Sequence, residues 1–342
     1  SEMNINGLMG SLQSGVAQGV LWGIMVLGVY ITYKLLDIPD LTADGSFTLG
    51  GCVTTVAILS GIPPVPATLM GMGAGFLAGA VTGILHTVFE IPAILAGILT
   101  QIGLWSVNLR IMGGKANNPL LKADTTVSFF TDRLGISNSQ ASMLVGILLV
   151  ILVILILYWF FGTEIGSALR ATGDNEDMIR ALGVNTGHTK LLALAISNAL
   201  IGLSGAMIAQ MQKYADINMG RGAIVIGLAA IVIGEVLLGR LVKNFGFKLF
   251  SAILGSIVYF IIQALVLRFG MDANDMKLLS AIMVAAALAI PVAMSRYNQK
   301  KSYSPNDLYA EEHRLAKQAG ASSGSSAAGT AGGQADSKGG EQ

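Results

Sequence analysis

Polar side chains inside the apolar stretches of this sequence are its first candidates for chemistry. Gln101, Trp105 and Asn108 follow one another at positions i, i+4 and i+7 of an apolar segment that begins after Pro92. This spacing places two amides and an indole on one face of a helix. Such groups can hydrogen-bond a small polar solute in apolar surroundings, or they can join one helix to another.

A second polar group lies at the start of a short apolar segment. Asp44, Ser46 and Thr48 are two residues apart, and Gly45 among them permits unusual backbone conformations. Residues 37–46 are polar and contain proline and glycine, so we expect them to be irregular. Contact with a solute and hydrogen bonding between helices are both open interpretations of this group as well.

The sequence lacks the motifs of common enzyme and metal sites. It contains no G-x-x-x-x-G-K-[ST], H-E-x-x-H or C-x-x-C pattern. Its three histidines, His86, His188 and His313, lie in separate segments, and Cys52 is its single cysteine. We therefore expect no metal centre, no cofactor and no catalysis by this chain. Any dependence on ATP must come from another subunit.

The composition is that of a membrane protein. Of 342 residues, 53% are hydrophobic and only 12% are charged. The charged share is about half that of soluble proteins, which excludes an ordinary cytoplasmic enzyme. The net charge of +1 provides no general attraction to nucleic acid.

Apolar segments predict an all-α fold, a polytopic transmembrane helical bundle with about 8–10 membrane segments. They lie near residues 11–36, 46–60, 65–89, 92–112, 142–161, 190–212, 223–239, 246–268 and 276–295. A membrane span needs roughly 20 apolar residues, so segment 46–60 is short for a full crossing. We expect it to be a broken or re-entrant segment that lines a cavity.

Glycines recur at intervals of four residues in two of these segments. The two runs are Gly15, Gly19, Gly23 and Gly75, Gly79, Gly83. Each run puts three glycines on one helix face, which favours close helix packing within the chain over a subunit interface. The spacing from Gly45 to Gly50 is repeated from Gly222 to Gly227, as in an inverted repeat with two broken segments.

The polar segment 162–190 separates two long apolar segments and predicts a short surface helix. Acidic residues, which suit a helix N-terminus, can start it: Asp174, Glu176 and Asp177. Its apolar face consists of Met178, Ile179 and Leu182. Gly183 then ends the helix. This helix either offers its apolar face to a partner outside the bilayer or only rests on lipid.

Residues 165–185, IGSALRATGDNEDMIRALGVN, resemble the cytoplasmic coupling loop of ABC-importer permeases of the branched-chain amino acid and ribose permease superfamily. Asp177 and Gly183 also keep the acidic-x5-Gly spacing of the wider importer loop, although Met178 and Ile179 replace its alanines. Residues 38–50 and 91–103 also resemble this superfamily, and residues 38–50 are similar to its subgroup assigned to tryptophan, tyrosine or uncharacterised substrates. The resemblance extends over residues 10–295.

This resemblance implies a transporter with several subunits in a bacterial cytoplasmic (inner) membrane. Two permease copies would work with two cytoplasmic ATPases and an extracytoplasmic, usually lipid-anchored, binding protein. The solute would be small, with an amino acid, aromatic ones included, as the best candidate. The residues that couple to the ATPase would be Asp174, Asn175, Glu176, Asp177, Met178, Ile179, Leu182 and Gly183. The solute path would use Asp44, Ser46, Thr48, Gln101, Trp105 and Asn108.

A secondary transporter or channel that works without ATPases is the alternative function. Ion coupling usually needs paired ionisable groups in the middle of the membrane, and this sequence offers few. The polar segment 162–190 would also have no role in such a protein. We therefore favour the ATP-dependent permease, in which motion of the loop rocks the helices between outward-facing and inward-facing states.

Three regions follow from this interpretation. They are a transmembrane permease domain (1–295), a cytoplasmic juxtamembrane segment (296–318) and a disordered Gly/Ser-rich tail (319–342). The basic residues Arg296, Lys300 and Lys301 follow the last apolar segment, which places the C-terminus inside. Arg221 then counts among the cations of the outer loops. The side of the N-terminus stays open, because it depends on whether 46–60 crosses.

Overall fold

The apolar segments of the sequence form helices over most of the chain. The computed structural model describes residues 5–121, 123–238, 244–268, 278–287, 289 and 292–293. The described residues up to 287 belong to one compact unit. The predicted juxtamembrane segment and tail, 296–318 and 319–342, lie outside the described residues.

Six helices in the described part are long and apolar enough to cross a membrane. They are α1 (Ile5–Tyr30), which continues as the π-helix η1 (Ile31–Leu35), α3 (Pro64–Thr87), α4 (Ala93–Ile111), α6 (Asn138–Gly162), α9 (Thr186–Gln212) and α11 (Phe245–Arg268). The shorter apolar helices are α2 (Ala43–Leu59), α10 (Ala223–Leu238) and Leu278–Ala287. Every apolar segment of the sequence thus contains a helix, which confirms the predicted polytopic all-α bundle.

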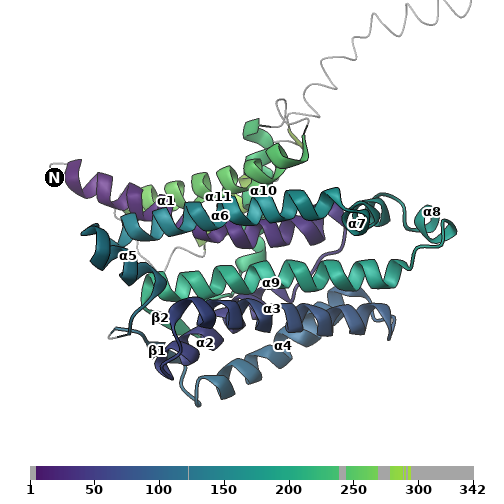
Figure 1. Ribbon diagram of the computed structural model, residues 1–342. Helices are drawn as coiled ribbons and strands as arrows, with labels where there is room; N and C mark the ends of the chain where they lie inside the picture. The colour runs from purple at the N-terminus through teal and green to yellow at the C-terminus, as the bar shows by residue number, and fades with distance from the viewer. Residues whose placement is uncertain are drawn as a thin grey trace, which may run out of the picture. The chain divides into compact units, whose positions relative to one another are not determined.

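Short elements lie at the two opposite ends of the long helices (Figure 1). At one end, which we name the strand end, β1 (Asn117–Pro119) pairs antiparallel with β2 (Tyr214–Asp216). Helix α5 (Thr126–Leu134) lies at this end as well. At the other end, which we name the loop end, α7 (Glu164–Asp174) and α8 (Glu176–Ala181) connect α6 to α9.

Both glycine runs pack against other helices of the same chain. A Cβ atom on Gly75 or on Gly79 of α3 would lie 2.3 Å from a backbone oxygen of α9. A Cβ atom on Gly19 of α1 would lie 2.7 Å from the Cα of Ile257 in α11. Since no larger side chain fits at these distances, the prediction of close packing within the chain is confirmed.

Enlarging one of these glycines is expected to prevent folding. Gly79→Leu should force α3 away from α9, because the new side chain would meet backbone atoms that cannot move aside. The loss of the monodisperse peak in size-exclusion chromatography in detergent measures this effect. Gly73→Leu is the matched control, because a Cβ atom at Gly73 in the same helix meets no atom within 4 Å. Equal yields of the two variants would contradict the prediction.

Helix α9 forms the centre of the bundle and packs against α1, α2 and α3. Hydroxyl groups of α9 attach it to the backbone of α1: Ser197 Oγ donates to Gly28 O at 2.7 Å, and Ser204 Oγ donates to Leu21 O at 2.8 Å. Both serines are buried, and their hydrogen bonds satisfy groups that would be costly to leave unpaired. Two contacts seven residues apart therefore fix α9 to α1 along two turns.

The chain breaks between η1 and α2. A left-handed backbone at Asp37 (φ 56°) and the following Pro39 end the first helix. Helix α2 begins at Ala43, so the expectation of irregular backbone over 37–46 is wrong for its last residues. Asp44 falls in the first turn, where a carboxylate is favourable, and this supports the earlier helix start.

The two short helices α2 and α10 start at the same place and run in opposite directions. Gly45 at the start of α2 lies against Gln101, in the middle of α4. From there, α2 runs to the strand end, where Cys52 packs in a cluster with Ala215 of β2. Helix α10 runs to the loop end, where Glu235 pairs with Lys34 of η1 at 2.8 Å. This arrangement fits the inverted repeat that the glycine spacing indicates.

Candidate functional site

One pocket contains most of the polar residues that were predicted for a solute path. It has a volume of about 400 Å³ and lies where α2 and α4 meet the turn before α10. It is lined by Asp44, Gly45, Thr48, Gln101, Ile102, Trp105, Ser106, Asn108, Ile217 and Arg221. Of the predicted path residues, only Ser46 is outside this lining.

Asp44 joins the starts of two helices. Its Oδ2 accepts a hydrogen bond from the backbone N–H of Gly222 at 2.9 Å, and its Oδ1 accepts one from Ile224 at 3.0 Å. One helical turn further along α2, Thr48 Oγ1 accepts a hydrogen bond from the N–H of Gly220 at 3.1 Å. These two side chains therefore hold the turn before α10 against α2.

Asn108 is buried, but its amide is only partly satisfied. The residue is 1% exposed, and its Nδ2 donates a long hydrogen bond of 3.5 Å to Gly45 O. Its Oδ1 has no partner among the described residues. Because buried polar groups are nearly always paired, this covered oxygen beside the pocket is an acceptor that still lacks a donor. Ser46 Oγ is also buried without a partner, but it does not line the pocket.

Arg221 is the charged pocket residue that the sequence interpretation missed, and Ser106 is a second polar one. Its position in a polar connection assigns it to the outer-loop cations, whereas the structure places it in the pocket wall. It lies in the turn that Asp44 and Thr48 hold. The repeated glycine spacing that begins at Gly222, one residue further on, is the signal that could have identified this turn.

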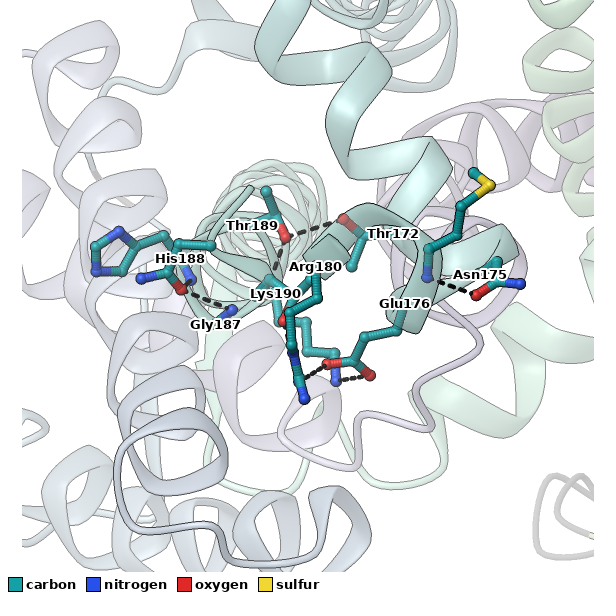
Figure 2. A network of polar contacts seen from close by, with 11 residues as sticks. Thr172, Asn175, Glu176, Arg180, Gly187, His188, Thr189 and Lys190 are labelled. Atoms are coloured by element: carbon teal, nitrogen blue, oxygen red, sulfur yellow. Dashed lines mark hydrogen bonds and ion pairs between the residues drawn. The ribbon is translucent and has the colours of Figure 1, made fainter. Parts of the chain in front are cut away.

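Ionic and hydrogen-bonding contacts fix α8 and α7 to α9 at the loop end (Figure 2). Glu176 Oε1 pairs with Arg180 at 2.8 Å, and its Oε2 pairs with Lys190 Nζ of α9 at 2.5 Å. The hydroxyl oxygens of Thr172 and Thr189 are 3.2 Å apart and share a hydrogen bond between α7 and α9. The loop is therefore tied to α9 at two successive residues of that helix.

The hydrogen bond from Lys190 holds the pKa of Glu176 below its ordinary value. A carboxyl group with a lowered pKa in the folded state contributes stability above the pKa of the unfolded chain. This contribution is lost only when the pH falls through the lowered pKa. The connection between α8 and α9 is therefore fully present at neutral pH.

Helix α8 starts later than the sequence predicts. Its N-cap is Asn175, whose Oδ1 accepts a hydrogen bond from Met178 N at 2.9 Å. Asp174 does not start this helix as predicted, because it is the last residue of α7, a helix that the sequence pattern did not reveal. An asparagine cap competes well with a neighbouring aspartate. Gly183, with φ of 86°, follows the end of the helix, as predicted.

The predicted apolar face of α8 is divided in the structure. Met178 is 52% exposed and Leu182 at the C-terminal end of the helix is 71% exposed. Ile179 is only 6% exposed, so the expectation that it also faces outward is wrong. A helix of six residues cannot turn three neighbouring apolar side chains in one direction while it also packs on the bundle. Two apolar side chains are left for a partner.

Metal ligands do not gather in the described part of the chain. No group of three His, Cys, Asp or Glu side chains is close enough there to hold an ion. Cys52 is buried in an apolar cluster, and His86 Nδ1 is 2.9 Å from the backbone oxygen of Ile91. The two candidate sites are the pocket and the 162–190 loop, because they contain the predicted site residues other than Ser46.

Known proteins are similar to this chain over almost all of its apolar segments. The model of the family described as "Branched-chain amino acid transport system / permease component" matches residues 11–287. A tyrosine transport system permease protein of Clostridioides difficile (strain R20291) is 40% identical over 297 residues, which are 85% of this chain and 96% of the relative. An uncharacterized protein of Rickettsia prowazekii (strain Madrid E) is 32% identical over 283 residues, 82% of this chain and 98% of the relative.

A more distant relative is the autoinducer 2 import system permease protein LsrC of Yersinia pseudotuberculosis serotype O:3 (strain YPIII). It is 31% identical over 220 residues, which are 62% of this chain and 59% of the relative. These matches confirm a transport permease in place of an enzyme, and they confirm the ABC-importer class that residues 165–185 resemble. The chain belongs to the family of permease components of branched-chain amino acid transport systems.

Proposed function

We propose that this permease couples to an ABC ATPase through α8 and passes a small solute, an amino acid, by the pocket between α2 and α4. The exposed pair Met178 and Leu182 is the observation that carries this proposal. These apolar side chains project from a helix that Glu176 and Lys190 hold rigidly on the bundle. Apolar anchors on a preorganised helix are the type of surface that a soluble partner protein binds.

Helix α9 would transmit motion from the ATPase to the pocket. Near its start, Lys190 holds α8. Two turns later, Asn198 Nδ2 donates to Asp40 Oδ2 at 2.6 Å, in the segment that leads into α2. Further on, Gly205 packs directly on the backbone of Phe47 in α2. Since α2 supplies one wall of the pocket, a displacement of α8 would move that wall through packed contacts.

Removing the lysine of this connection is expected to uncouple ATP hydrolysis from transport. In Lys190→Met, Glu176 loses its partner on α9, while the exposed face of α8 is kept. We expect the amount of solute imported per ATP hydrolysed to fall about fivefold or more. A fivefold effect is at the lower end of what the coupling between two sites usually produces. Lys115→Met, at an exposed lysine near the strand end, is the control. An unchanged ratio in Lys190→Met would contradict the proposed connection.

The remaining partners follow from the position of the two sites. With α7 and α8 on the cytoplasmic side of a bacterial inner membrane, the strand end faces the extracytoplasmic binding protein, and α1 begins on that outer side. Arg221 is exposed and Gln101 partly exposed in the lining of the pocket. Polar groups halfway across a membrane are costly to leave against lipid. A second permease copy would therefore cover this face.

An amino acid is the solute that the comparisons favour. The family is described by branched-chain amino acid transport, and the C. difficile relative, covered over 96% of its length, is described by tyrosine transport. The pocket of about 400 Å³ is large enough for one amino acid of either kind. We take tyrosine as the first solute to test.

ATP-dependent uptake by the complete system tests this function. Proteoliposomes would contain the permease, its ATPase and its binding protein, and the measurement is uptake of radiolabelled L-tyrosine and of the other natural amino acids. We expect uptake with ATP and none with a non-hydrolysable ATP analogue. Uptake by the permease alone, driven by an ion gradient, would instead establish the secondary transporter.

A further inference from the structure

Arg221 is an exposed cation in the lining of the pocket between α2 and α4, and the described part of the chain places no counter-ion beside it. Its guanidinium forms no ion pair or side-chain hydrogen bond with the residues that the structure describes. The backbone around it is fixed, because Gly220 N–H donates to Thr48 and Gly222 N–H donates to Asp44. Gln101, in the middle of the apolar helix α4, lines the same pocket. An arginine at such a depth is costly to leave against lipid, so an unpaired one indicates a ligand.

The pocket also contains an unused acceptor. Asn108 is 1% exposed, and its Oδ1 has no hydrogen-bond partner among the described residues. The carboxylate of Asp44 accepts one backbone N–H at each oxygen, and a carboxylate oxygen can accept a second donor. The pocket thus offers one cation, one anion and one neutral acceptor to a molecule inside it.

Charge balance restricts what that molecule can be. Arg221 and Asp44 together contribute no net charge, so a simple anion would meet the Asp44 carboxylate and a simple cation would meet the Arg221 guanidinium. A neutral sugar would leave both charges uncompensated. A zwitterion satisfies both, because its carboxylate can form a bidentate pair with arginine while its ammonium donates to the two acceptors.

Apolar side chains complete the pocket. Ile102, Trp105 and Ile217 belong to its lining. The indole of Trp105 is a surface on which an apolar or aromatic side chain can pack. The polar and apolar linings together match the two parts of an α-amino acid, its charged head and its side chain.

We propose that this pocket binds a free α-amino acid, with Arg221 pairing with the carboxylate, Asp44 and Asn108 Oδ1 accepting the ammonium, and Trp105 contacting the side chain. This assignment rests on the proposed function, amino acid import. It adds a specificity residue, Arg221, and it requires an unmodified α-carboxylate on the solute.

The test compares three forms of the complete complex in proteoliposomes: wild type, Arg221→Gln and Arg221→Lys. The probe is whichever radiolabelled amino acid the wild type imports from the panel above. We expect Arg221→Gln to lower uptake about tenfold or more, because one charge-assisted pair with the solute is lost. Arg221→Lys should keep part of the uptake, because lysine retains the charge but not the bidentate geometry.

Two further measurements separate the assignment from its rivals. Arg110→Gln, at an exposed arginine of α4 outside the pocket lining, should transport like wild type. Binding of the same amino acid to the permease–ATPase complex without binding protein should be competed by the unlabelled amino acid but not by its decarboxylated amine. In Arg221→Gln, this direct binding should be lost.

The outcomes separate the proposed function, amino acid import, from the assignment of the pocket residues. A wild-type complex that imports none of the amino acids overturns the proposed function and this assignment with it. A wild type that imports one, with an Arg221→Gln variant of equal uptake and binding, overturns the assignment alone. Arg221→Gln complexes that separate into single permease copies would also overturn it, because Arg221 would then pair with the second copy.

Discussion

Replacing Met178 and Leu182 by aspartate is expected to abolish binding of the ATPase. Both side chains are exposed on α8 and contact few groups of the permease itself, so the bundle should fold normally. Each apolar side chain is expected to contribute about 1.4 kcal/mol to binding when it is buried against the partner. Losing both therefore lowers the affinity about a hundredfold. Two charges placed in the same interface would add a desolvation cost. Co-purification with a tagged ATPase measures the loss.

The control for this double variant is Ile165→Asp. Ile165 is an equally apolar and exposed side chain of the same loop, but it lies on α7. It should leave ATPase binding and ATP-driven uptake unchanged. If the α8 variant co-purified with the ATPase as well as wild type did, α8 would not be the docking element. Loss in both variants would extend the docking surface to α7.

Asp44→Ala is expected to destabilise the protein and to abolish transport. Without the carboxylate, the N–H groups of Gly222 and Ile224 lose their acceptor at the start of α10. Two unsatisfied donors at about 1–3 kcal/mol each give a loss of about 3 kcal/mol in the free energy of unfolding. The Tm of the purified permease in detergent and uptake in proteoliposomes measure the two effects.

Ser46→Ala provides the comparison within the same helix turn. Ser46 is fully buried, but its Oγ has no hydrogen-bond partner among the described residues, so its removal leaves no group unsatisfied. We expect its free energy of unfolding to change by no more than about 0.5 kcal/mol, as for a neutral substitution, so its Tm should stay close to that of wild type. An Asp44→Ala protein as stable as Ser46→Ala would show that the contacts with α10 contribute little.

The sequence predicted the pocket wall on α4 because the relevant spacing is local. Gln101, Trp105 and Asn108 share one face of a single helix, and this follows from the helical period alone. The same period explains why Ser46 does not line the pocket. Once residues 43–59 are helical, Asp44 and Thr48 share a face, whereas a residue two positions from each points to a different side.

Arg221 could not be predicted in the same way because its position depends on distant parts of the chain. The contact between Asp44 and Gly222 joins residues 178 positions apart. Hydropathy reports how apolar a segment is, but it does not tell which two segments meet. A polar turn inside the bundle and a polar loop outside it therefore have the same sequence pattern.

The start of α8 was misplaced for a local reason. Acidic residues are favourable throughout a first turn, so three neighbouring acids indicate a helix start without fixing its first residue. The cap itself, Asn175, decided the boundary and assigned Asp174 to α7. Gly183 was predicted correctly because a left-handed residue after a helix is nearly specific to glycine.

The two walls of the pocket are held with very different strength. In the apolar 18-residue stretch of each long helix, 89% of the residues are buried for α1 and 83% for α9, but only 22% for α4. Asp44 and Thr48 belong to α2, which packs against α9, whereas Gln101 and Trp105 are carried by α4. We therefore expect a displacement that reaches α2 through α9 to change the width of the pocket, because few contacts within the chain make α4 follow it.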